Sequence, residues 1–171
     1  MPRSFTLGGS PWSTKAEWRA ALAPAEIQLN ANAESWLSHP DFPFGAVPPG
    51  ELLILTASEL GLPQGGTRAE LEAAAQTQGL EPCPAMAALA LRLAWADQPE
   101  GRLAREHRAP DGSVTIMSLP FLPEPPSDPE DDYGFYLIRA EGQLWLRGYV
   151  APADHIWAPH DVLAWSKVSS H

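Results

Sequence analysis

Proline is the residue that most constrains how this chain can fold. The sequence has nineteen prolines, and each one removes a backbone donor and fixes φ, so helices end before it and central strands exclude it. The prolines concentrate in residues 39–50 and 120–132. We therefore expect two irregular segments there, an extended connection and an exposed loop, with short regular elements between them.

Four segments before residue 98 have the patterns of helices. Capping boxes at residues 14–17 and 67–70 predict two helix starts, and Gly79 is a natural end for the second helix. Pro24 opens a further candidate helix over residues 24–37. Residues 84–96 are apolar on nearly every side of a helix, which is typical of a buried, central one.

Other segments have the patterns of strands. Residues 51–56 form a short continuous apolar run, typical of a strand that is covered on both faces. Two hairpins are predicted around the turns Pro110-Asp111-Gly112 and Glu141-Gly142. Strands after residue 101 are predicted at Leu103–Arg108, Ser113–Leu119, Phe135–Arg139, Leu144–Val150 and Val162–Val168.

Together these elements predict a single α+β domain over residues 1–171. A helical N-terminal half at about 10–98 is expected to pack on a mostly antiparallel C-terminal sheet of about four to five strands at about 102–168. The helix over residues 84–96 is expected to seal the apolar side of this sheet, because it needs a covering layer on every face.

The charge of the chain limits its partners. Eleven lysines and arginines face twenty-one acids, which gives a formal net charge of −10. Binding to nucleic acid or to an anionic membrane surface depends on basic residues, so neither is expected. A basic protein partner or a small molecule is easier to accommodate.

The single cysteine, Cys83, permits no intrachain disulfide and no zinc site built from several cysteines. The first residues lack an apolar run of signal-peptide length, and no stretch is long and apolar enough to cross a bilayer. These features predict a cytoplasmic protein without a cofactor.

Two sets of residues are candidates for binding a partner. Acidic side chains gather in the proline-rich loop, where they suit a basic surface. Aromatic and arginine side chains alternate on one face of a predicted strand, and these residue types are favoured at interfaces. If a helix covers this face, the aromatic residues belong to the core instead. The candidates are Asp128, Glu130, Asp131 and Asp132 in the loop, and Trp145, Arg147 and Tyr149 on the strand.

Three other patterns have both a chemical and a structural interpretation. His155, His160 and Asp161 have residue types that bind metals, although their spacing matches no established metal motif and Asp161 can equally cap a turn. Cys83, at a predicted helix start, is either a low-pKa nucleophile aided by a base such as His107 or His155, or an inert buried thiol. Residues 61–66 can hold an anion or simply form a turn before a capped helix.

Three segments carry a resemblance: Glu59-Leu-Gly-Leu-Pro-x-Gly-x-Thr67, Gly79-Leu-Glu-Pro-Cys-Pro84 and Leu91-Arg-Leu-x-x-x-Asp97-Gln-Pro-x-Gly101. They resemble a group of small uncharacterised bacterial proteins over about a third of the chain. The resemblance implies no activity, cofactor or catalytic residue.

Two functions follow as hypotheses. The first is a non-enzymatic acidic binding or inhibitor module that acts on a protein partner, because no catalytic motif stands out and an acidic loop is predicted at the surface. The alternative is a small metal-dependent hydrolase that uses the His155, His160 and Asp161 cluster.

Overall fold

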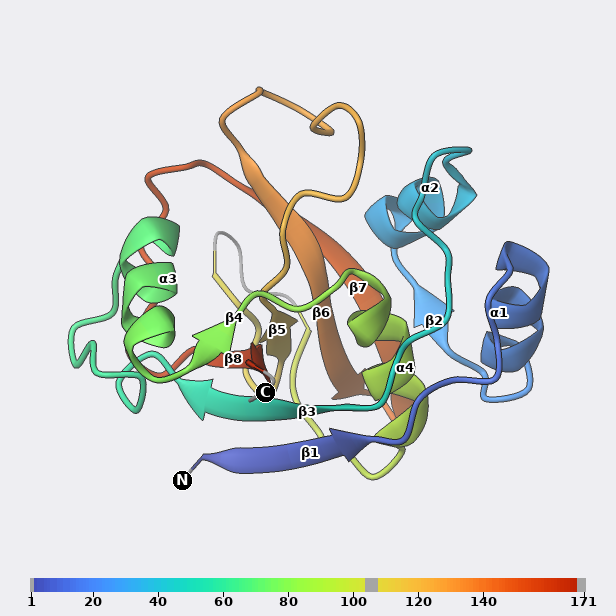
Figure 1. Cartoon of the computed structure of the whole chain (residues 1–171), viewed down its shortest axis with the longest axis horizontal. Coiled ribbons are helices and arrows are strands. Elements are labelled where there is room, and N and C mark those ends of the chain that lie inside the picture. Colours follow the sequence, from blue (N-terminus) through green and yellow to red (C-terminus); the bar gives the residue numbers. More distant parts are fainter. Residues whose placement is uncertain (1, 104–107, 169–171) are drawn as a thin grey trace.

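The computed structural model describes residues 2–103 and 108–168. Within these ranges the helices are α1 (Lys15–Leu22), α2 (Ala31–Ser38), α3 (Arg68–Thr77) and α4 (Met86–Ala94). The strands are β1 (Arg3–Leu7), β2 (Gln28–Leu29), β3 (Gly50–Thr56), β4 (Leu80–Glu81), β5 (Val114–Ile116), β6 (Asp132–Ala140), β7 (Gln143–Ala151) and β8 (Val162–Lys167). They form one eight-stranded sheet in the order β1-β3-β8-β5-β6-β7-β2, with β4 paired to the end of β8 (Figure 1).

The predicted sheet of four to five C-terminal strands is wrong. β1, β2, β3 and β4 come from the N-terminal half, where they are interspersed with the helices, and β3 lies between β1 and β8. Two pairs of this mixed sheet are parallel, β2 with β7 and β5 with β8. The apolar run of β3 requires a central place, because both of its faces must be buried. Leu52 and Ile54 pack on one side of the sheet and Leu55 on the other.

One of the two predicted hairpins is present. β6 and β7 pair along their whole length, and the turn between them has positive φ at Glu141 (55°) and Gly142 (74°), as a two-residue hairpin turn requires. Of the other predicted hairpin, the second strand is present as β5, which pairs with β6 on one side and with β8 on the other. Its first strand was predicted over residues 103–108. Residues 104–107 of that predicted strand lie outside the described residues.

The predicted helix over residues 24–37 is also wrong at its start. The chain turns after Ala23, with positive φ at Glu26 (56°), and forms β2 before α2 begins. Asn30 caps α2 through its side-chain oxygen, which accepts from the Ala33 N–H at 3.0 Å. The same side chain exchanges hydrogen bonds with the backbone N–H and C=O of Gly148 on β7, at 2.8 and 2.9 Å. A capping asparagine inside the apolar pattern therefore sets the helix start.

The helices cover the sheet unequally. α1, α2 and α4 pack on one face, whereas α3 packs on the other, beside β3 and β8 (Figure 1). The prediction of a buried central helix over residues 84–96 is confirmed by α4, which contacts β6, β7 and β1. No helix in the described residues is long and apolar enough to span a bilayer.

A polar network is buried beneath α4. The Arg92 side chain is fully buried, donates to Gln98 Oε1 and to the Trp95 carbonyl, both at 2.7 Å, and reaches the Trp145 carbonyl at 3.2 Å. Burial lowers the pKa of its guanidinium to about 10. Gln98 in turn donates to the carbonyls of Gly112 and Leu137. One arginine and one amide thus join the end of α4 to β6, β7 and the turn before β5.

Candidate functional site

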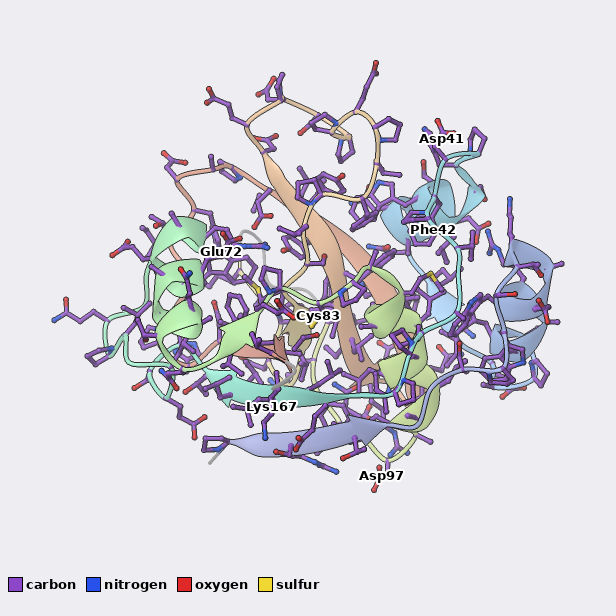
Figure 2. All side chains as sticks on the ribbon, in the orientation of Figure 1. Asp41, Phe42, Glu72, Cys83, Asp97 and Lys167 are labelled. Carbon is purple, nitrogen blue, oxygen red and sulfur yellow. The ribbon has the colours of Figure 1, made fainter. Side chains whose placement is uncertain are left out.

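A groove lined by prolines and acids lies where three distant segments meet. We call it the proline groove; its volume is about 730 Å³, and it is lined by Asp41, Pro43, residues 81–85 and residues 119–123. Two of its walls are fixed to each other, because the Cys83 N–H donates to the Met117 carbonyl. The Asp41 side chain lies beside α2, and Cys83 lies near the middle of the molecule (Figure 2).

The lining of the proline groove combines apolar surface with negative charge. Leu119 is 61% exposed and is one of four large apolar side chains that are exposed in the described part of the chain. Asp41 and Glu81 are exposed at the groove, and neither forms an ion pair with any cation of residues 2–103 and 108–168. The surface is therefore suited to an apolar group flanked by positive charge.

The acidic proline-rich loop continues from this groove. Its base is anchored, because the N–H groups of Phe121 and Leu122 both donate to the Tyr133 hydroxyl, at 2.9 and 2.8 Å. The Phe121 ring also stacks on Phe135, with ring centres 5.3 Å apart and nearly parallel. The exposed part of the loop beyond this anchor is at the upper edge of the view in Figure 1. Its exposed acids are Glu124, Asp128 and Glu130.

The four predicted loop acids have different surroundings. Asp128 and Glu130 are exposed, whereas Asp131 is half-buried and accepts a hydrogen bond from Ser127. Asp132 begins β6 and forms an ion pair with Arg68 of α3 at 3.1 Å. Burial raises the pKa of Asp132, and Arg68 opposes this change. Asp132 therefore holds α3 to the sheet, and the other three predicted acids form no ion pair within the described residues.

The face that carries Trp145, Arg147 and Tyr149 is only partly covered. Tyr149 packs edge-on against Trp157 with ring centres 5.5 Å apart. Trp157 belongs to the core under α3, and Tyr149 is partly buried against this core. Burial raises the pKa of the Tyr149 hydroxyl. Arg147 lines a hollow of about 420 Å³ beside β6 and β7, and Tyr149 and Trp157 line it as well. The sequence left open whether this face was core or surface, and the structure divides it between the two.

The predicted histidine and aspartate cluster lies in one loop, residues 152–161. Asp161 accepts a hydrogen bond from the Ala158 N–H at 2.8 Å, which closes a turn. Burial raises its pKa, while this hydrogen bond and the nearby His160 and His155 lower it. No group of three His, Cys, Asp or Glu side chains in the described part of the chain could hold a metal ion. The geometry of Asp161 is that of a turn cap.

Cys83 has none of the features of a nucleophile. Its side chain is 2% exposed, and burial raises the pKa of its thiol to about 12. The sulfur donates weakly to the Ala164 carbonyl at 3.6 Å. His107, one base considered for this thiol, lies outside the described residues. A buried, protonated thiol is inert.

The turn over residues 61–66 uses its backbone groups within the protein. Gly66 exchanges two backbone hydrogen bonds with Trp157, at 3.1 and 2.8 Å, and the Gly65 N–H donates to the Leu62 carbonyl. Thr67 then forms the predicted capping box with Glu70, which confirms the start of α3. These N–H groups are therefore not free to hold an anion.

The sequence did not indicate the proline groove, because its walls are far apart in the chain. The only local signal was the proline density of the segments that form it. Two of the three segments that carry the resemblance have structural roles. In the first, Thr67 caps α3; in the last, Gln98 is buried and a Cβ on Gly101 would lie 2.3 Å from the Asp111 carbonyl oxygen. No protein-family model matches the chain, and neither a curated protein nor a solved structure matches it.

Proposed function

We propose that this protein is a non-enzymatic binding module that holds a basic segment of a protein partner in the proline groove. The observation that carries the proposal is the combination of exposed Leu119 with Asp41 and Glu81, whose carboxylates lack an ion-pair partner among the described residues. An apolar anchor on the partner would contact Leu119 and the prolines, while flanking lysines or arginines would meet the two acids.

The groove is suited to binding because it is rigid before the partner arrives. Proline side chains have little conformational freedom to lose, so covering them costs little entropy. The hydrogen bonds from Phe121 and Leu122 to Tyr133 fix the neighbouring wall. The acids of the adjoining loop extend the negative surface, which favours fast association with a basic partner.

The overall charge favours the same class of partner. A net charge of −10 disfavours nucleic acid and anionic lipid, for which basic residues are the main source of affinity. We place the module in the cytoplasm, where a lone cysteine ordinarily stays reduced. The alternative of a metal-dependent hydrolase has no metal-binding group among the described residues to support it.

Synthetic peptides test the proposal directly. The probe is a short labelled peptide with a central leucine flanked by lysines, compared with a twin flanked by glutamates, and binding is measured by fluorescence anisotropy. We expect the lysine peptide to bind more tightly than its glutamate twin. Its affinity should fall as the salt concentration is raised from about 0.1 M to 1 M, because the Debye screening length then shortens to about 3 Å.

Charge-neutral variants locate the binding surface. Asp41→Asn combined with Glu81→Gln should weaken the lysine peptide by about fivefold, because each exposed ion pair contributes roughly 0.2–1 kcal/mol. Asp97→Asn combined with Asp154→Asn removes the same charge at other exposed positions and should change the affinity by less than about twofold. Equal binding of the two peptides, or an equal loss in both double variants, would contradict the proposal.

A further inference from the structure

The hollow beside β6 and β7 differs in charge from the rest of the chain. It is lined by Arg108, Arg147 and His155, and no described residue that lines it is acidic. The whole chain has almost twice as many acids as lysines and arginines. A positive concave site of about 420 Å³ in such a chain has the size of a small-molecule pocket. We call it the arginine pocket.

Three polar side chains form a row across the floor of the arginine pocket. Thr115 of β5 lies opposite Tyr136 of β6, and Tyr136 lies opposite Arg147 of β7. The Tyr136 hydroxyl accepts a hydrogen bond from Arg147 Nε at 2.7 Å. Because paired residues of adjacent strands share a face, the register of the sheet places these side chains together.

The guanidinium of Arg147 is fixed in position but keeps its outer nitrogens available. It lies over the Trp145 ring, 4.9 Å from the ring centre, and 5.9 Å from that of Tyr136. Neither Nη atom donates a hydrogen bond or forms an ion pair with any residue in the described ranges. The two free Nη atoms can donate side by side to two oxygens of a carboxylate or phosphate group.

A second polar group points to a ligand independently of Arg147. The side chain of Thr115 is 98% buried, since only 2% is exposed, and it lines the pocket. Its hydroxyl forms no hydrogen bond with the described residues, and its oxygen is not one of the fully enclosed polar atoms that lack a partner, so it stays open to the pocket. A ligand oxygen in the pocket would supply a partner.

We propose that the arginine pocket binds a small aromatic anion, whose carboxylate or phosphate group is held by Arg147 and Thr115. The aromatic rings of Tyr136, Tyr149 and Trp157 line the pocket and provide flat apolar surface for the ring of the ligand. This site is separate from the proline groove, and no residue lines both. Binding of a small anion in the arginine pocket is therefore independent of the proposed protein partner in the proline groove.

A set of small probes tests the anion and the ring separately. The purified protein is titrated with benzoate, benzamide, acetate and phenyl phosphate, and binding is followed by amide NMR shifts. Benzamide keeps the ring without the charge, and acetate keeps the charge without the ring. We expect the tighter of benzoate and phenyl phosphate to bind at least about tenfold better than benzamide and acetate, and the comparison of these two identifies the anionic group.

Variants of the pocket provide the matched controls. Arg147→Met should weaken the anion by roughly tenfold or more. Arg139→Met removes the same charge from β6 outside the pocket, where the arginine meets Glu100 at 3.6 Å, and should leave affinity within about twofold. Thr115→Val preserves the shape and β-branching of a buried strand residue, so it tests the site even where Arg147→Met fails to fold.

The possible outcomes separate clearly. Tight binding of an aromatic anion that Arg147→Met or Thr115→Val weakens, and that Arg139→Met does not, supports the arginine pocket. Equal affinity for benzoate, phenyl phosphate and benzamide overturns the proposal, as does unchanged affinity in folded Arg147→Met. A failure of the lysine peptide to bind the proline groove has no bearing on either result.

Discussion

The buried amide of Gln98 allows a worked prediction of stability. Its side chain is 1% exposed and makes three hydrogen bonds. It donates to the carbonyls of Gly112 and Leu137 at 3.2 and 3.1 Å, and accepts from the Arg92 guanidinium at 2.7 Å. Gln98→Met removes all three bonds and keeps most of the volume, so the change tests the polar contacts with little contribution from a cavity.

The expected loss of stability follows from these three contacts. A neutral hydrogen bond contributes about 1 kcal/mol, and one to a charged group about 1.5–3 kcal/mol. Two neutral bonds and one charged bond therefore amount to about 3.5–5 kcal/mol. A domain of this kind is stable by about 5–15 kcal/mol, so Gln98→Met should remain folded at room temperature but melt much earlier.

Urea denaturation measures this loss, with tryptophan fluorescence as the readout because the chain has seven tryptophans. The control is Asp97→Asn, because Asp97 is next to Gln98 in the chain but is exposed and forms no hydrogen bond with the described residues. This substitution should change the free energy of unfolding by less than about 0.5 kcal/mol. Figure 2 shows Asp97 at the outside of the molecule. A loss of less than about 1 kcal/mol in Gln98→Met would refute the reasoning, because the buried contacts would then contribute no net stability.

Three further predictions concern single positions. Cys83, whose thiol pKa is raised to about 12, should resist alkylation at pH 8 in the native protein and react fully in denaturant; rapid native labelling would contradict its burial. Gly148→Ala should destabilise by about 1–3 kcal/mol in thermal unfolding, because the new Cβ would lie 2.4 Å from the Trp36 ring, whereas Gly8→Ala has open space and should not. Thr67→Ala should cost about 1 kcal/mol through the lost cap of α3, and an unchanged melting temperature would argue against that cap.

Local signals in the sequence were sufficient for some elements. The capping boxes at Thr14 and Thr67 mark the starts of α1 and α3, because their hydrogen bonds lie within four residues of the chain. The turn of Glu141 and Gly142 likewise specifies the β6–β7 hairpin. Each of these depends on contacts between near neighbours, which a sequence pattern can record.

The strands that were missed depend on distant partners. β2 and β4 have two residues each, too few for any periodicity, and exist because β7 and β8 pair with them. β1 is an edge strand that pairs with β3, and its outward residues are polar. Its short, largely exposed pattern resembles that of a loop, so only the sheet register distinguishes it.

The arginine pocket shows the same limit for function. The sequence placed Trp145, Arg147 and Tyr149 on one face, which their alternation requires. It gave no indication of Thr115 and Tyr136, because their position beside Arg147 depends on the register of three strands. The alternation of side chains along one strand predicts which of its residues share a face. Their neighbours on other strands are known only once the pairing of the strands is known.

The hydrogen bonds between Asn30 and Gly148 have a consequence for self-association. The exposed edge of a sheet can template a strand from another molecule, which leads to aggregation. On β7, Trp145 and Leu146 are already paired with β2, and the asparagine amide occupies both backbone groups of Gly148. An incoming strand finds few open donors and acceptors there. β1, the first strand in the order of the sheet, pairs with β3 alone among the described strands and is the more open margin for extension between copies.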